Sequence, residues 1–267
     1  MTSVRSEELE PGIAHLVMDR PQARNALSFQ LVDDLRRAFA ELARDRDCRV
    51  VILSGAGRGF CAGADLKSDE PPPDARDRSR VGLVYRAQEH LAELMLAIRE
   101  LPKPVIAAVH GAAVGGGLAL TLVSDLRIAD ETAFFGSVFI RVGLSSCDVG
   151  TSYLLPRIVG AGRAAELMLT GRHFDAREAE RIGLVQEVVP EGELIESALE
   201  TARLIRANSE YGVWMTKQGL WANLDAPSLR HAMELENRTQ VLGTFTDNMT
   251  EAARAFREGR APKWNRL

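Results

Sequence analysis

Two short runs of apolar residues, each followed by glycines, limit the folds open to this chain more than any other feature. The runs occupy residues 50–53 (VVIL) and 105–109 (VIAAV), and both contain only aliphatic side chains. Strands without polar alternation are buried on both faces, which is typical of a parallel sheet covered by helices. The sequence therefore predicts a mixed α/β core.

Helical patterns lie between the predicted strands. Residues 13–18 alternate in the manner of a further strand. Ser28, a favoured N-cap residue, precedes a segment with one apolar helical face. The apolar positions of that face are Leu31, Leu35, Phe39 and Leu42. Residues 81–99 fit another helix, so strands and helices alternate along the first part of the chain.

The chain changes in character after residue 185. Strand signals almost vanish there, and helical stretches follow at residues 193–207, 210–224, 227–242 and 247–258. We therefore expect residues 1–200 to form the core and residues 201–267 to form a helical C-terminal region. Within the core, the proline-rich residues 67–80 predict a surface loop that could act as a flap.

Composition and charge exclude several classes of partner. The 267 residues are 46% hydrophobic, and 33 basic against 37 acidic residues give no basic surface for nucleic acid. The N-terminus lacks the apolar core of a signal peptide, and no apolar stretch reaches the roughly 20 residues that cross a bilayer. The three cysteines lack metal-binding spacing, so no metal site is expected. The sequence predicts a cytoplasmic protein that binds neither nucleic acid nor membrane.

Two glycine-containing loops follow the buried strands. The first is residues 59–66 (GFCAGADL) and the second is residues 110–119 (HGAAVGGGLA). Neither contains the GxGxxG of dinucleotide sites or the GxxxxGK of phosphate loops. Glycines at the start of a helix can present backbone N–H groups to an anion, but they also permit tight strand-to-helix packing. One loop alone does not decide between these alternatives.

Together, the two loops resemble the paired motifs of the crotonase superfamily, also called the enoyl-CoA hydratase/isomerase family. Further similar motifs occur in order along the chain: RPQARNAL at 20–27, residues 104–108, Ser124-Asp125, LPR at 155–157, AERIGLV at 179–185 and PKW at 262–264. The resemblance implies an α/β fold of the crotonase type, a spiral of strand-and-helix turns. It also implies a helical C-terminal region that assembles homotrimers, commonly paired into hexamers.

The resemblance further implies an acyl-CoA thioester as ligand, with coenzyme A as part of the substrate and no separate cofactor. The backbone N–H groups of Ala64 and Gly116 correspond to the family's oxyanion hole, where fixed donors stabilise a thioester enolate. The positions implied around coenzyme A are Arg24, Ala26, Ala62, Asp65, Leu66 and Lys263. Lys263 would contact a CoA phosphate across a subunit boundary, although solvated surface charge is the alternative for both Arg24 and Lys263.

Hydratases of this family use two glutamates, and this chain has neither. The resemblance aligns them with Ala119 and Phe139, whose side chains cannot transfer a proton. Asp148, in a DVGT segment similar to that of the family's dienoyl-CoA isomerases, could replace them, or it could cap a helix at residues 151–159. Two functions stay open. One is an enzyme that uses Asp148 for isomerisation or another enolate reaction, and the other is a non-catalytic acyl-CoA-binding or sensing protein.

Overall fold

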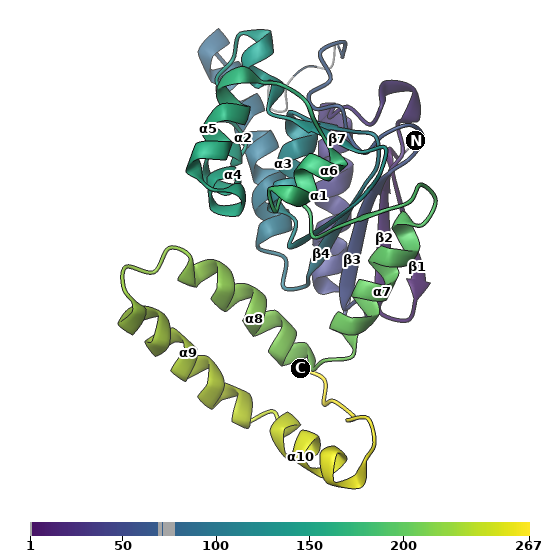
Figure 1. Ribbon diagram of the computed structural model, residues 1–267, viewed down its shortest axis with the longest axis vertical. Coiled ribbons are helices and arrows are strands. Elements are labelled where there is room, and N and C mark those ends of the chain that lie inside the picture. Colours follow the sequence, from purple (N-terminus) through teal and green to yellow (C-terminus); the bar gives the residue numbers. More distant parts are fainter. Residues whose placement is uncertain (1, 69–70, 72–77) are drawn as a thin grey trace.

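A six-stranded sheet forms the centre of the computed structural model, which describes residues 2–68, 71 and 78–267 (Figure 1). The strand order is β1-β2-β3-β4-β6-β9. The strands are Val4–Glu10, Ile13–Met18, Val50–Gly55, Val105–Val109, Leu126–Asp130 and Glu187–Val189. Only the β1 and β2 pair is antiparallel among these described pairs. The strands predicted at residues 13–18, 50–53 and 105–109 are therefore confirmed, and they lie side by side.

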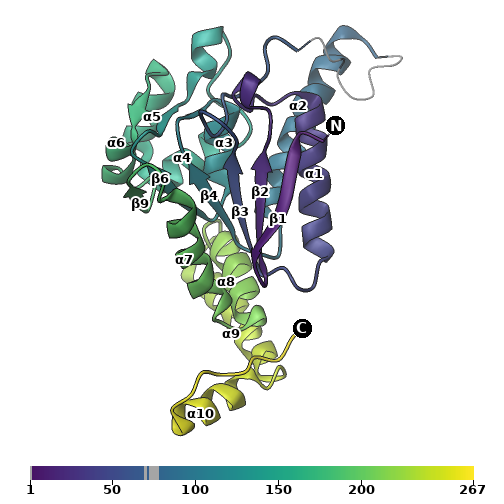
Figure 2. The same ribbon diagram turned by 90° about the vertical axis from the view of Figure 1, so that its right-hand side faces the viewer.

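Helices cover both faces of this sheet (Figure 2). α1 (Phe29–Arg44), α2 (Arg80–Arg99) and α3 (Gly116–Val123) pack on one face, and α7 (Leu194–Arg206) packs on the other. Successive residues of a strand point to opposite faces. In β3, accordingly, Leu53 belongs to the core under α1 and Ile52 to the core under α7. This burial on both sides explains the unbroken apolar runs.

The predicted cap of α1 is present. The hydroxyl of Ser28 accepts a hydrogen bond from the Leu31 N–H at 3.2 Å, and Leu31, Leu35 and Phe39 are fully buried against the sheet. By contrast, the sequence does not predict β9. Its three residues form a strand because their backbone pairs with β6, which a local pattern does not reveal.

A second, smaller sheet lies beside the first and includes part of the second glycine loop. It consists of β5 (Ala112–Val114), β7 (Phe134–Gly136) and β8 (Phe174–Asp175). β5 leads directly into α3, and β7 leads into the short 3-10 helix η2 (Val138–Val142). Three further helices complete this part: α4 (Thr151–Val159), α5 (Ala161–Thr170) and α6 (Ala176–Arg181).

The last three helices leave the core as an arm (Figures 1 and 2). They are α8 (Glu210–Asn223), α9 (Leu229–Thr244) and α10 (Asn248–Glu258), close to the predicted bounds. Residue 200, the predicted boundary, falls within α7, and the arm begins after that helix. Within the described residues, no helix is long and apolar enough to cross a membrane. The predicted flap lies largely outside the described residues.

Candidate active site

Hydrogen bonds join the two glycine loops side by side. The Phe60 N–H donates to the His110 carbonyl and the Cys61 N–H donates to the Ala112 carbonyl, each at 2.8 Å. The Val114 N–H returns a bond to the Cys61 carbonyl at 3.1 Å. Isolated bridges consequently pair Gly59 with Gly111 and Cys61 with Ala113. The loops thus form one rigid unit between the two sheets.

Two glycines are required for this close approach. Gly63 has a φ of +88°, and a Cβ atom there would lie 2.8 Å from the Val114 carbonyl oxygen and 3.3 Å from the Gly116 nitrogen. A Cβ atom at Gly117 would lie only 2.1 Å from the Cys61 carbonyl oxygen. No side chain fits at such distances. The packing alternative is therefore correct for these glycines, and the same packing brings Gly63 next to the first residue of α3.

The N–H groups of Ala64 and Gly116 have no hydrogen-bond acceptor among the described residues. Ala64 forms a parallel bridge with Leu27, but both hydrogen bonds of this bridge are made by Leu27 and the neighbours of Ala64. The Leu27 N–H donates to the Gly63 carbonyl at 2.7 Å, and the Leu27 carbonyl accepts from the Asp65 N–H at 3.1 Å. Gly116 opens α3, whose first intrahelical bond runs from the Ala119 N–H to the Gly115 carbonyl at 3.1 Å. Both donors are therefore available to a ligand, and the helix dipole favours a negative one.

The two positions where the family's glutamates would stand are apolar and buried. Ala119 is fully buried in α3, and Phe139 in η2 is 9% exposed. The Phe139 ring borders the second loop, because its Cε1 would lie 3.9 Å from a Cβ atom at Gly115. The Phe139 ring therefore borders the second loop, and Ala119 lies in the core, so neither position carries a carboxylate.

Asp148 lies half-buried in the segment before α4. Its carboxylate accepts hydrogen bonds from the Val149 N–H and from the side-chain amide of Gln88 on α2. The pKa of the Asp148 carboxyl is raised above its ordinary value of 3.8. Burial is the largest cause, and it outweighs the two hydrogen bonds, which lower the pKa. A raised pKa makes the ionised carboxylate a stronger base for proton transfer.

The alternative of Asp148 as a helix cap is wrong. The N-cap of α4 is Gly150, and no side chain caps that helix. Asp148 contributes only its backbone carbonyl, which accepts from the Thr151 N–H at 2.7 Å. The chain turns here through Val149 and Gly150 with φ values of +38° and +84°. Such a value is rare for a β-branched residue. The Asp148 side chain contacts Gln88 of α2 and not the helix end.

Contacts connect the Asp148 segment to Phe139. The Leu144 N–H donates to the Phe139 carbonyl at 3.1 Å. The hydroxyl of Ser146 lies 3.3 Å from the Ser137 carbonyl oxygen and 2.9 Å from that of Met168. Residues 144–148 are therefore held against the 3-10 helix that borders the second loop.

The predicted coenzyme A positions of the first half gather around the first loop. The Ala62 N–H donates to the Arg24 carbonyl at 3.0 Å, so these two segments run together. Ala26 is buried, whereas Arg24 is exposed and Leu66 is 76% exposed. Asp65 is only partly exposed, because Arg20 binds its carboxylate with an Nη2–Oδ2 distance of 2.9 Å.

Two polar residues that support the first loop, Arg20 and Asn25, were not assigned this role from the sequence. Asn25 is fully buried; its amide nitrogen donates to the carbonyls of Ala56 at 2.9 Å and Gly59 at 2.8 Å, and its oxygen accepts from the Arg20 N–H at 2.9 Å. His110 contacts the segment before the first loop, with its Nε2 lying 3.0 Å from the Gly57 carbonyl oxygen. The RPQARNAL motif contains both Arg20 and Asn25 and is the signal that could have identified them.

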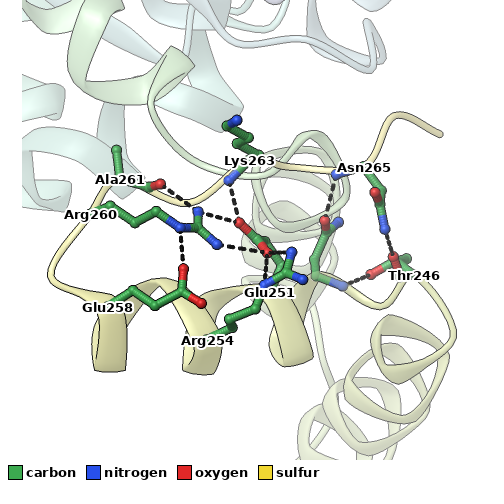
Figure 3. A network of polar contacts seen from close by, with 9 residues as sticks. Thr246, Glu251, Arg254, Glu258, Arg260, Ala261, Lys263 and Asn265 are labelled. Carbon is green, nitrogen blue, oxygen red and sulfur yellow. Dashed lines mark hydrogen bonds and ion pairs between the residues drawn. The ribbon is translucent and has the colours of Figure 1, made fainter.

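The remaining predicted position, Lys263, lies on the C-terminal arm and away from the loops. α3 is in the upper part of the molecule and α10 at its lower end in both views (Figures 1 and 2). Glu251 of α10 accepts hydrogen bonds from the Lys263 N–H at 2.8 Å and from Arg260 at 2.7 Å (Figure 3). The exposed Lys263 side chain extends away from Glu251. The structure thus does not bring Lys263 to the loops of its own chain.

The fold and the two joined glycine loops define a protein of the crotonase superfamily. More particularly, the chain belongs to the enoyl-CoA hydratase/isomerase family, whose model matches residues 8–266. Proteins of this family act on acyl-CoA thioesters.

Individual relatives agree with this assignment. The chain is 42% identical over 257 residues to a "Probable enoyl-CoA hydratase EchA12" of Mycobacterium tuberculosis, covering 96% of this chain and 90% of the relative. A solved probable enoyl-CoA hydratase/isomerase from Mycobacterium abscessus has 39% identity and a TM-score of 0.94, with 98% of each chain covered. A solved monofunctional enoyl-CoA isomerase from M. smegmatis has 42% identity and a TM-score of 0.75, covering 87% of this chain and 99% of that one.

Proposed function

We propose that this chain is an enoyl-CoA isomerase that moves a carbon–carbon double bond through a thioester enolate. One combination supports the proposal: the unpaired N–H groups of Ala64 and Gly116, a single acid at Asp148, and hydrocarbon at Ala119 and Phe139. The monofunctional isomerase among the similar structures is consistent with this choice.

The proposed reaction needs only one acid. The Asp148 carboxylate takes a proton from C2 of a 3-enoyl-CoA, and the electrons of that C–H bond form the C1–C2 double bond of an enolate. The thioester oxygen takes the negative charge beside Ala64 and Gly116, and each such donor contributes roughly 100- to 1,000-fold in rate. The protonated Asp148 then delivers its proton to C4. The carbonyl reforms and the double bond lies between C2 and C3.

Hydration makes demands that these residues do not meet. Water must be activated by one group while a second group handles the proton at C2. The aromatic ring of Phe139 lies beside Gly115, and the methyl group of Ala119 is fully buried. A dry, apolar wall favours a reaction in which water is not a reactant. Isomerisation gains and loses no atoms, so the missing acids do not prevent it.

The binding positions follow from the same proposal. Coenzyme A would run along the first loop past Arg24, Ala26, Ala62, Asp65 and Leu66, with Leu66 free to contact it through an exposed side chain. Lys263 would reach a CoA phosphate bound by a neighbouring subunit. The substrate's own coenzyme A is sufficient, because the reaction moves only a proton and a double bond.

The exposed apolar residues of the C-terminal arm support the proposal of a homotrimer or a hexamer. α9 buries none of its residues within one chain, and Phe245 and Phe256 are 80% and 88% exposed. Apolar side chains at this exposure are typical of an interface. Light scattering should give a mass of three or six chains, and a monomer mass would contradict the assembly.

The test combines turnover with binding. Wild-type protein should convert 3-hexenoyl-CoA to 2-hexenoyl-CoA, and Asp148→Asn should reduce that rate at least about 100-fold while acyl-CoA binding measured by calorimetry persists. Asp47→Asn, on an exposed turn, is the matched control and should have wild-type activity. Unchanged turnover in Asp148→Asn would remove Asp148 from the mechanism.

The non-catalytic alternative gives different results. An acyl-CoA-binding or sensing protein would bind hexanoyl-CoA without isomerising 3-hexenoyl-CoA and without exchanging the C2 hydrogens of hexanoyl-CoA for deuterium in heavy water. A chain that binds no acyl-CoA at all would contradict both functions.

A further inference from the structure

Gln88 is the residue of α2 that reaches the Asp148 segment, and the two are 60 residues apart in sequence. Its side-chain amide donates to Oδ1 of Asp148. The second donor to that carboxylate is the Val149 N–H. Among the described residues no ion pair involves Asp148, so both partners are neutral. Gln88 therefore supplies the side-chain contact that comes from outside the Asp148 turn.

The backbone that carries Gln88 is firmly placed. Two residues further along α2, His90 is buried, with its Nδ1 lying 3.0 Å from Arg36 Nη1 on α1. Arg36 also lies 2.9 Å from Glu93, five residues beyond Gln88. α2 buries Leu94 and Ile98 in the core. Helix packing consequently fixes the backbone from which the exposed Gln88 side chain extends to Asp148.

A neutral donor suits an acid that must both take up and release a proton. A lysine or arginine at this place would favour the charged carboxylate strongly and make it a weaker base. An apolar residue would remove this donor and leave, among the described residues, the backbone of Val149 to orient the carboxylate. The glutamine amide orients the carboxylate and still permits protonation.

We propose that Gln88 is a positioning residue, which holds the Asp148 carboxylate from α2 in the orientation needed for proton transfer. The inference rests on the proposed function, because it assigns Gln88 an effect on the chemistry of Asp148. Gln88 itself takes no proton and is not a catalytic residue.

Three variants test the proposal. Gln88→Leu should lower kcat for 3-hexenoyl-CoA roughly ten- to 100-fold, the range that misorientation of a reacting group produces, with little change in KM. Gln88→Glu should lower kcat further than Gln88→Leu does, because a second carboxylate disfavours the charged form of Asp148. Gln30→Leu removes a comparable glutamine contact to Asp34 at 2.9 Å on α1, and it should retain wild-type turnover.

The readout that a merely structural role would not change is the protonation of Asp148. Carbon-13 NMR of the aspartate carboxyls, with the Asp148 signal assigned by its loss in Asp148→Asn, reports that protonation without any turnover. Its titration should move to higher pH in Gln88→Leu and further in Gln88→Glu, and the matching limb of the pH–rate profile should move with it.

The outcomes separate the two proposals. If Asp148→Asn abolishes turnover but Gln88→Leu keeps the wild-type rate and the wild-type Asp148 titration, the inference about Gln88 is wrong and the proposed function stands. If Asp148→Asn has no effect, the proposed function fails and the catalytic role of Gln88 fails with it. Thermal unfolding of each variant checks that the fold is intact.

Discussion

Arg20 Nη2 lies 2.9 Å from Asp65 Oδ2, and the two residues are 45 positions apart in the chain. The other guanidinium nitrogen, Nη1, donates to the Ala26 carbonyl at 2.6 Å. One arginine therefore fastens the first glycine loop to the segment that carries Arg24 and Ala26. The residues proposed to contact coenzyme A depend on this ion pair for their arrangement.

Replacing Arg20 should loosen the first loop. Arg20→Met retains an aliphatic side chain but removes charged hydrogen bonds, so we expect the free energy of unfolding to fall by about 1.5–3 kcal/mol and acyl-CoA affinity to fall with it. Urea denaturation and calorimetry measure the two effects. Arg5→Met removes an ion pair to Asp19 of similar length, 2.8 Å, at side-chain exposures of 53% and 33%. The Arg5→Met control should lower the free energy of unfolding by less than about 1 kcal/mol. Equal losses of stability in both variants would contradict a special role for Arg20.

Gly63 should not tolerate a side chain. Gly63→Ala places a Cβ atom 2.8 Å from a backbone oxygen at a φ of +88°, so we expect about 1–3 kcal/mol of destabilisation and a displaced Ala64 N–H. Isomerase activity should fall more than stability predicts. Gly162→Ala is the opposite case, because nothing lies within 4 Å of its Cβ position inside α5. It should stabilise the protein by about 0.5–1 kcal/mol in the same denaturation experiment.

Restoring one glutamate should not create a hydratase. Phe139→Glu introduces a single carboxyl while Ala119 remains unable to transfer a proton, so the crotonyl-CoA hydration rate should stay within about ten-fold of wild type. Phe139→Gln, which has the same shape without the charge, is the control for packing. Efficient hydration by Phe139→Glu alone would show that one acid is enough and would weaken the case for isomerisation.

The Glu251 cluster makes the arm sensitive to acid (Figure 3). Hydrogen bonds from Arg260, the Lys263 N–H and Arg254 lower the pKa of the Glu251 carboxyl from 4.5 to about 2. A lowered pKa stabilises the fold above pH 4.5, and that contribution is lost as the pH falls toward 2. Glu251→Gln should therefore be less stable than wild type at pH 7, and the difference should shrink in acid.

Urea midpoints at several pH values measure this difference. Glu258→Gln is the control, because Glu258 is exposed and its ion-pair partner within the described part of the chain is Arg260, at 2.5 Å. Loss of this exposed pair should change the free energy of unfolding at pH 7 by less than about 1 kcal/mol. A Glu251→Gln difference that is constant from neutral to acidic pH would contradict the assignment.

Much of the architecture was predictable because local patterns encode it. The buried runs at residues 50–53 and 105–109, the cap at Ser28 and the helices of the arm each depend on a short stretch of sequence. β9 was not predictable, because three residues have too little pattern and β6 supplies their pairing. The cap interpretation of Asp148 failed because the positive φ of Val149 turns the chain before α4.

The sequence by itself determined the family, the two glycine loops and the absence of acids at Ala119 and Phe139, since these are properties of residue identity and order. Only the tertiary structure decided that Gly63 meets Gly116, that Arg20 binds Asp65 and that Gln88 reaches Asp148. The physical reason is that these partners lie far apart in the chain. Their contacts depend on how strands, helices and turns pack together, and no local window of sequence contains that information.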